Sequence, residues 1–176
     1  AKVSDDTYLY GIFNPAASLP AFCGPGCLLG VTLLNNTPVE TGIVQLRLAL
    51  GIGFKGRATA TAAHEIGHAH GRGHANCGPG LDPRSIDAEY PTDGPHAGGK
   101  IGVWGFDMAE KKLVPPTSTD IMGYCDNQWI SDYNFVKLWN RVKNVNTASW
   151  QLPANATFDY DVIALDGAGG ARWAQS

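Results

Sequence analysis

The sequence predicts an α+β domain in which short strands come first and two helices follow, the first of them carrying a cluster of histidines. Three observations support this class. Apolar stretches of strand length precede residue 51, an alanine-rich stretch with helical spacing runs from Thr59 to His74, and a second helical pattern begins at Ser131. At 176 residues the chain is long enough to bury a core of its own.

Composition and charge argue against several classes of protein. Hydrophobic residues make up 44% of the chain and charged residues 16%, and the 22 glycines and 11 prolines indicate many turns. A net charge of -3 offers no electrostatic basis for binding nucleic acid or an anionic membrane. No apolar run is long enough to span a bilayer, so we expect no membrane span.

Three stretches before the first helix have the character of strands. Tyr8–Phe13 is rich in aromatic and aliphatic residues, which favours a buried strand. A second candidate, Leu28–Leu34, is ended by asparagines and a proline. In the third, Ile43–Leu50, apolar and polar residues alternate in part, as in a half-exposed strand, and glycines separate it from the helix that follows.

The stretch Thr59–His74 reads TATAAHEIGHAHGRGH and contains an HExxHxxGxxH pattern. His64 and His68 are four residues apart, so on a helix they lie on one face, where both imidazoles can bind one zinc ion. Gly71 allows the chain to leave the helix through a left-handed turn. That turn can bring His74 back as a third ligand.

Three protein ligands leave a fourth position for water, which is typical of a catalytic zinc site. Glu65 follows the first ligand and is placed to accept a proton from a zinc-bound water. Four of the five histidines fall within eleven residues, which incidental surface histidines do not explain. We expect His70 to face away from the site, and we interpret His96 as a surface histidine rather than a fourth ligand.

The long segment 75–116 is rich in turns and has little periodicity, and a loop of this length is usually functional or disordered. The apolar island Ile101–Met108 argues for order within it. Its carboxylates match no calcium-loop motif, so we interpret them as solvated groups rather than a calcium site. They are Asp82, Asp87, Asp93 and Asp107.

The second helical pattern begins at Ser131 or Asp132, either of which can cap a helix. Apolar residues recur on one face of this helix, and we expect that face to lie in the core: Phe135, Leu138, Trp139 and Val142. Further on, Phe158–Trp173 suggests a strand, a glycine-rich turn and another strand. Residues 153–176 are therefore expected to form a hairpin-like tail or the start of an accessory domain.

The histidine pattern, together with the stretch DIMGYC at residues 120–125, resembles the metzincin clan of zinc endopeptidases. The stretches IGVWGFDM and WISDYNF add a similarity to secreted bacterial members of the clan, the gametolysin-like families among them. The resemblance implies a zincin-like catalytic domain over residues 1–152. Its upper subdomain, about 1–74, would hold a twisted, mostly parallel sheet and the active-site helix. Its lower subdomain, 75–152, would hold the second helix. Only three strands precede the histidines, fewer than such a sheet usually has.

The same resemblance assigns roles to two residues after the histidines. Met122 would form the Met-turn beneath the zinc. Tyr124, two residues further on, would ligate zinc at rest and hydrogen-bond the tetrahedral intermediate during catalysis. The alternative for Tyr124 is a buried tyrosine whose hydroxyl is satisfied by the fold.

Four cysteines allow three pairings, and the sequence does not select one of them. We favour Cys23–Cys27, which are close along the chain, and Cys77–Cys125, which would tie the segment after the third histidine to the Met-turn. Disulfides indicate an oxidising compartment, so we expect a secreted protein.

We therefore predict a secreted, monomeric zinc endopeptidase that cleaves protein or peptide substrates. Its zinc ligands would be His64, His68 and His74, and its catalytic residues Glu65, as general base, and Tyr124. Two other hypotheses remain. One is a zinc-dependent binding module without peptidase activity, in which Glu65 would have no purpose. The other is a structural-zinc domain of a larger surface protein, which the open coordination position argues against.

Overall fold

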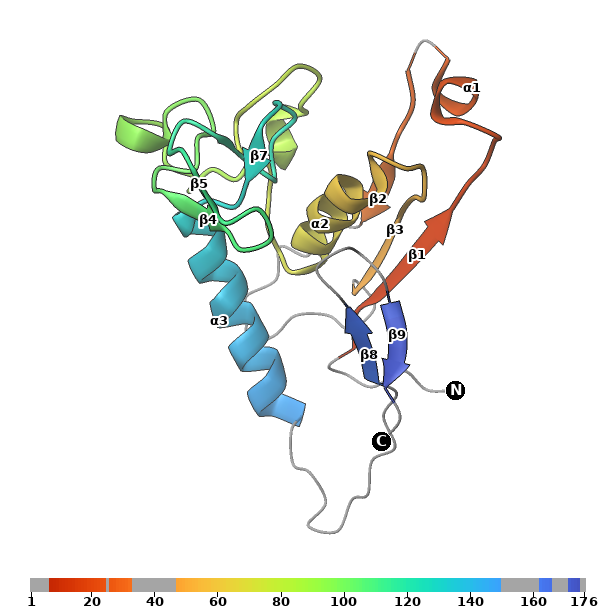
Figure 1. The fold of residues 1–176 in the computed structure, drawn as a ribbon. Helices are drawn as coiled ribbons and strands as arrows, with labels where there is room; N and C mark the ends of the chain where they lie inside the picture. Colours follow the sequence, from red (N-terminus) through yellow and green to blue (C-terminus); the bar gives the residue numbers. More distant parts are fainter. Residues whose placement is uncertain (1–6, 25, 33–46, 150–161, 166–170, 175–176) are drawn as a thin grey trace.

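The computed structural model describes residues 7–24, 26–32, 47–149, 162–165 and 171–174. They form a mixed arrangement of helices and short strands (Figure 1). The α-helices are α1 (Leu19–Cys23), α2 (Ala58–Ala69) and α3 (Asp132–Ser149). The strands are β1 (Leu9–Phe13), β2 (Gly30–Thr32), β3 (Leu48–Ile52), β4 (Gly105–Asp107), β5 (Lys112–Val114), β6 (Thr119–Asp120), β7 (Gln128–Trp129), β8 (Val162–Leu165) and β9 (Ala171–Ala174). None of the helices in this part of the chain is long and apolar enough to cross a membrane.

The first three strands form one sheet in the order β1-β3-β2. β1 is parallel to β3, and β2 is antiparallel to it. Because β3 lies between the other two, β2 is an edge strand of the sheet in the described part of the chain. β1 confirms the first predicted strand. β2 lies within the second predicted strand. β3 begins later than predicted and continues through Gly51. Residues 33–46, which hold parts of both later predictions, lie outside the described residues.

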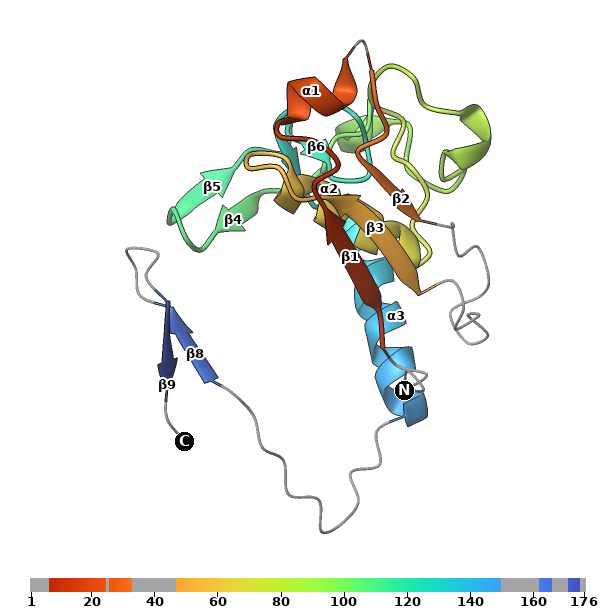
Figure 2. The ribbon, with the colours of Figure 1, turned by 90° about the vertical axis from the view of Figure 1, so that its right-hand side faces the viewer.

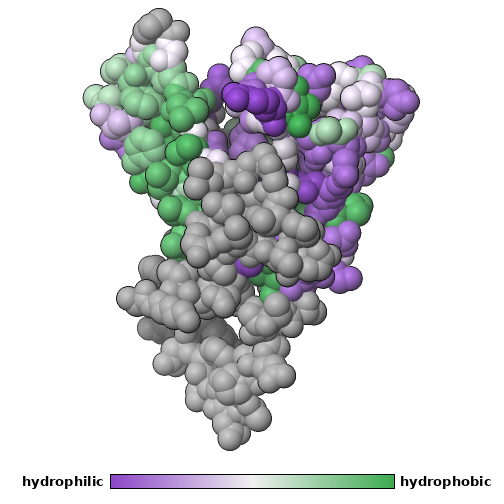
Figure 3. All heavy atoms as spheres, turned by 180° about the vertical axis from the view of Figure 1, so that it is seen from behind, coloured by the Kyte–Doolittle hydropathy of each residue, from purple (hydrophilic) through white to green (hydrophobic). Residues whose placement is uncertain are grey.

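α2 covers one face of this sheet (Figures 1 and 2). Gly51 lies within β3 rather than at its end, and a Cβ built there would clash with the hydroxyl of Tyr10 on β1 and lie 3.0 Å from Cγ2 of Thr61 on α2. A glycine in a strand often marks such a close approach. The opposite face of the sheet is apolar and exposed, with Leu9 beside Leu48 and Val31 beside Leu50. Seen from behind, apolar side chains gather over the region of β1, α1 and β2 (Figure 3).

Segment 75–116 contains little regular structure, as predicted, and short strand pairs hold the backbone from there through residue 131. β4 pairs with β5, and β6 pairs with β7. The core of this region consists of Ala75, Tyr90 and Met122. The predicted order of the apolar island at 101–108 is confirmed, since Ile101 is fully buried and the island contains β4.

α3 begins where predicted, and Ser131 caps it by accepting a hydrogen bond from the Asn134 N–H at 3.1 Å. The prediction that its apolar stripe lies in the core is wrong. Phe135 is 56% exposed and Trp139 57% exposed, whereas Asn134 and Arg141 are buried. The helix turns its polar face inward because that face meets hydrogen-bonding partners there, the carboxylate of Asp120 and the hydroxyl of Tyr8.

β8 and β9 form the hairpin predicted after this helix, with antiparallel pairing. In the described part of the chain they form a sheet of their own, without a third strand. Both predicted disulfides are confirmed: Cys23 is bonded to Cys27, and Cys77 to Cys125.

Candidate metal centre

Three histidines from α2 and the turn after it bring one ring nitrogen each to a common point. The Nε2 atom of His68 lies 3.1 Å from Nε2 of His64 and 3.1 Å from Nε2 of His74. Two nitrogens bound at ~2.1 Å to one tetrahedral ion are roughly 3.4 Å apart. The spacing of the three nitrogens therefore fits a single metal ion. They form the one group of potential metal ligands found among the described residues.

Local sequence explains this convergence. His64 and His68 are one helical turn apart on α2, and their rings meet at 4.7 Å between centroids. α2 ends at Ala69, and Gly71 has a φ of 84°, in the left-handed region that glycine adopts without strain. The chain therefore reverses, and His74 comes to lie 4.5 Å from the ring of His68.

The second nitrogen of each ring is held by a hydrogen bond. Nδ1 of His64 lies 2.7 Å from the carbonyl oxygen of Ile121, and Nδ1 of His68 lies 2.6 Å from that of Arg72. A carbonyl oxygen can only accept, so both Nδ1 atoms carry the proton. Nδ1 of His74 lies 2.7 Å from Oγ of Ser85. That hydroxyl donates to a carbonyl at 2.7 Å and so accepts from the imidazole.

Because Nδ1 donates in all three rings, each neutral ring presents a bare Nε2 lone pair to the other two. Three converging lone pairs repel one another unless a cation lies between them. Partners of this kind, behind the ligating atom, are typical of metal-bound histidines because they fix the tautomer and the ring orientation.

The rings are held neutral as well as oriented. Burial and the nearby His64 lower the pKa of His68 to about 3, against the opposing hydrogen bond to Arg72. Burial and His64 likewise lower the pKa of His74 to about 4. Burial also lowers the pKa of His64, and its hydrogen bond to the Ile121 carbonyl offsets part of that shift. A metal ligand must be unprotonated, so the cluster is ready to bind a cation at neutral pH.

Glu65 lies on α2 beside the triad and is only 7% exposed. Its carboxylate Oε2 accepts a hydrogen bond from the hydroxyl of Thr32, on β2, at 2.8 Å. Burial raises the pKa of Glu65, and the hydrogen bond from Thr32 works in the opposite direction. A carboxylate with a raised pKa is a stronger base than a solvated one.

Met122 and Tyr124 lie in one turn of the chain, which packs against α2 at Gly67. Met122 is fully buried, and its sulfur occupies the space that a side chain at Gly67 would need. The ring of Tyr124 lies 5.5 Å from that of His64 and 5.0 Å from that of His74. Burial and the charge of Glu65 raise the pKa of Tyr124, so its hydroxyl stays protonated and can donate. It is 48% exposed, so it is not the buried tyrosine of the alternative interpretation.

A cleft of about 610 Å³ runs along α2 and opens onto these groups. One wall consists of residues 27–30, before and at the start of β2, and the other of residues 123–128. Between them lie residues of α2, including His64 and Glu65. Tyr124 also lines the cleft. A molecule bound there would meet a carboxylate, an imidazole and a phenol together.

The other two histidines lie outside the triad. His70 stacks on Tyr8 with ring centroids 3.9 Å apart, which agrees with the prediction that it faces away. His96 is not the surface histidine that was predicted, since its side chain is only 15% exposed and its Nε2 lies 2.7 Å from Oδ1 of Asp132. It joins the segment before β4 to the start of α3.

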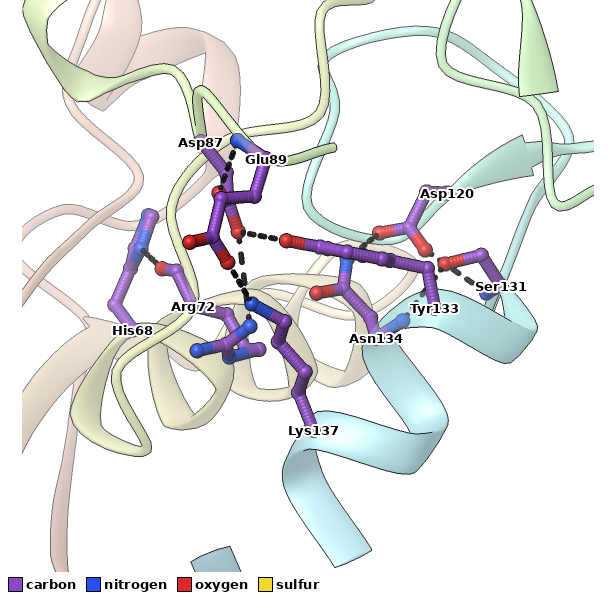
Figure 4. Close-up of polar contacts among 9 residues, drawn as sticks. All are labelled: His68, Arg72, Asp87, Glu89, Asp120, Ser131, Tyr133, Asn134 and Lys137. Atoms are coloured by element: carbon purple, nitrogen blue, oxygen red, sulfur yellow. Dashed lines mark hydrogen bonds and ion pairs between the residues drawn. The ribbon is translucent and has the colours of Figure 1, made fainter. Parts of the chain in front are cut away.

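Polar contacts behind the triad connect it to α3 (Figure 4). Nη1 of Arg72, whose carbonyl holds His68, lies 3.6 Å from Oδ2 of Asp87. Asp87 also accepts a hydrogen bond from the hydroxyl of Tyr133 at 3.0 Å. Asp87 was predicted to be solvated, but its side chain is 13% exposed because these partners enclose it.

A second polar group in the same region surrounds the carboxylate of Asp120, which is 0% exposed. It accepts hydrogen bonds from the Met122 N–H at 2.7 Å, from the Ser131 N–H at 2.8 Å and from the Asn134 amide at 2.9 Å. Asp120 thereby fixes the turn that carries both Met122 and the Ile121 carbonyl that holds His64.

Three residues that hold the site in place were not predicted from the sequence: Thr32, Ser85 and Asp120. Thr32 is 33 residues from Glu65, and Ser85 is 11 residues from His74. Neither contact follows a helical or strand period, so no pattern in the sequence marks it. The stretch DIMGYC contains Asp120, but its residue types alone do not show what the carboxylate binds.

Compared with family models, with curated proteins and with solved structures, the chain has no significant match.

Proposed function

We propose that His64, His68 and His74 bind one zinc ion. The observation that supports this most directly is the meeting of three Nε2 lone pairs, each fixed by an Nδ1 that donates elsewhere. Neutral imidazoles suit zinc, and an all-histidine set of three is a known catalytic arrangement for that metal. Three protein ligands also leave one position for water or substrate.

We further propose that the protein is an endopeptidase that hydrolyses peptide bonds in proteins or peptides held in the cleft. Zinc at this site would supply a Lewis acid that activates a water and polarises the scissile carbonyl. Glu65, with its raised pKa, accepts the proton of the attacking water and delivers it to the leaving amine. Tyr124 donates its hydroxyl hydrogen to the carbonyl oxygen as negative charge develops on it.

Three features support a metzincin architecture for this proposal. The left-handed turn at Gly71 lies between the second and third histidines, Met122 lies buried beneath α2, and a long helix follows. The sheet gives the least support, since β2 is antiparallel to β3 and this sheet has three strands in the described part of the chain. In this proposal residues 1–152 form the catalytic domain of a monomer, and 153–176 form a tail or the start of an accessory domain. Its two disulfides support secretion.

Two measurements test the proposal. Metal analysis of the purified protein should find about one zinc per chain, because three ligands hold one ion. Replacing any one of His64, His68 and His74 by alanine should sharply weaken retention of the metal. Full zinc content in the His74→Ala variant would contradict the assigned set of ligands.

Cleavage of a proteome-derived peptide library should depend on the metal and on Glu65. Glu65→Gln keeps the shape of the side chain and removes its basicity, so it should retain zinc and lose cleavage. Glu89→Gln is the matched control, because Glu89 is exposed and pairs with Lys137 on α3. Zinc binding without cleavage by the wild type would favour a binding module or a structural-zinc domain instead.

A further inference from the structure

Two of the three residues of strand β2, Gly30 and Thr32, lie against the carboxylate of Glu65. The hydroxyl of Thr32 lies 2.8 Å from Oε2 of Glu65 and 3.1 Å from the Glu65 carbonyl oxygen. The hydroxyl has one hydrogen, and the carbonyl already faces the N–H one turn further along α2. The carboxylate is the stronger acceptor, so the hydrogen goes to Oε2.

Gly30 provides the space for the other carboxylate oxygen. A Cβ built at Gly30 would lie 2.5 Å from Oε1 of Glu65 and 2.5 Å from its Cγ. Gly30 and Thr32 are two residues apart, so both face α2 from the same side of the strand. Val31, between them, points to the opposite face and is 47% exposed.

These contacts restrict a side chain that otherwise has three rotatable bonds. A general base acts only when its oxygen lies within hydrogen-bond reach of the proton that it removes. Fixing the carboxylate group before the substrate arrives lowers the entropy lost when its free oxygen reaches the reactive geometry. The hydroxyl of Thr32 holds one carboxylate oxygen of Glu65. The other oxygen is left for a water in the cleft.

We propose that Thr32 is a positioning residue for Glu65, and that its hydroxyl orients the carboxylate for proton transfer. The inference rests on the proposed peptidase function, which it deepens. It adds a residue from the edge strand of the sheet to a site otherwise built from α2 and the turn around Met122. The hydroxyl of Thr32 contacts Glu65 and would act through it, without touching the substrate.

The kinetic test uses an isosteric pair of substitutions. Thr32→Val removes the hydroxyl and keeps the shape, so kcat should fall about tenfold, the effect of one hydrogen bond to a charged group. KM and zinc content should stay at wild-type values. Thr32→Ser keeps the hydroxyl and should restore most of kcat. Val31→Thr makes the reverse exchange on the opposite face of the same strand and should leave kcat unchanged.

A second readout needs neither metal nor substrate. In the metal-free protein, Thr32→Val should lower the melting temperature by about 3–6 °C, as expected for one hydrogen bond to a charged group in a chain of this size. In the Glu65→Ala background the same substitution should have almost no effect, because its partner is gone. Equal shifts in both backgrounds would show that the two side chains do not interact, and would overturn the inference.

The two proposals fail in different ways. A wild-type protein without zinc-dependent cleavage would overturn the proposed function and the catalytic role of Thr32 with it. An active wild type, an inactive Glu65→Gln and a Thr32→Val with wild-type kcat would overturn only the inference. So would a Thr32→Ser variant as impaired as Thr32→Val, because the hydroxyl would then not be the group that matters.

Discussion

Removal of the Cys77–Cys125 disulfide should destabilise the protein more than removal of Cys23–Cys27. The first bond joins residues 48 apart in the sequence, and the second joins residues 4 apart. A disulfide stabilises mainly by restricting the unfolded chain, and this effect grows with the logarithm of the closed loop. That dependence gives about 4 kcal/mol for the long loop and about 2 kcal/mol for the short one.

The surroundings of Cys77 allow this difference to be observed. Cys77 is buried, and its carbonyl accepts a hydrogen bond from the Tyr124 N–H at 2.6 Å. The disulfide therefore connects the segment after the third histidine with the turn that carries Met122 and Tyr124. Replacing both cysteines by alanine removes the cross-link and leaves this backbone contact possible, so the measured loss reports mainly the cross-link.

The assay is thermal unfolding of the two double-alanine variants beside the wild type. For a chain of this size, a loss of about 4 kcal/mol lowers the melting temperature by roughly 8–16 °C, and a loss of about 2 kcal/mol by roughly 4–8 °C. Peptide mapping without reductant should first show both pairs joined in the wild type. Equal melting temperatures for the two variants would refute the loop-length reasoning, and free thiols at Cys77 and Cys125 would refute the pairing.

Three further predictions concern the site. Asp120→Ala leaves three buried donors without an acceptor, so the free energy of unfolding, measured in urea, should fall by at least about 3 kcal/mol. The control is Asp126→Ala, on the exposed part of the same segment, which should have little effect. Tyr124→Phe should lower kcat at least about tenfold and leave zinc content and melting temperature unchanged, and a loss of stability together with activity would show that the hydroxyl serves the fold. The metal-free protein should lose stability as pH falls from 6.5 toward 4, because in that window the unfolded histidines bind protons that His68 and His74 do not. This pH dependence is measured by urea unfolding of the Glu65→Gln variant, because the raised pKa of Glu65 would otherwise act in the opposite direction. Equal free energies of unfolding at pH 6.5 and pH 4 would contradict the prediction.

The histidine triad could be predicted from the sequence because its geometry is local. The spacing of His64 and His68 matches one helical turn, and Gly71 permits the reversal that returns His74. The same local rules predicted α2, the start of α3 and strand β1. The two disulfides agree with the favoured pairing, although the cysteine spacing alone allowed others.

Predictions that depended on packing partners were less accurate. The apolar stripe of α3 has the correct period for a buried face, yet Phe135 and Trp139 are exposed. Periodicity shows that a helix has an apolar side, but not which side the rest of the chain will cover. Likewise the glycines after the third predicted strand were expected to end it, yet Gly51 lies within β3, where the side chains of Tyr10 and Thr61 leave no room for a Cβ.

The sequence by itself determined which residues meet as potential metal ligands and which carboxylate lies beside them, because helix and turn geometry fix those positions within eleven residues. Only the tertiary structure decided what holds these groups in place. Thr32 reaches Glu65 from an edge strand, Ser85 orients His74, and Asp120 fixes the turn whose carbonyl holds His64. Such contacts join residues distant in the sequence through the packing of separate elements, and no local period encodes them.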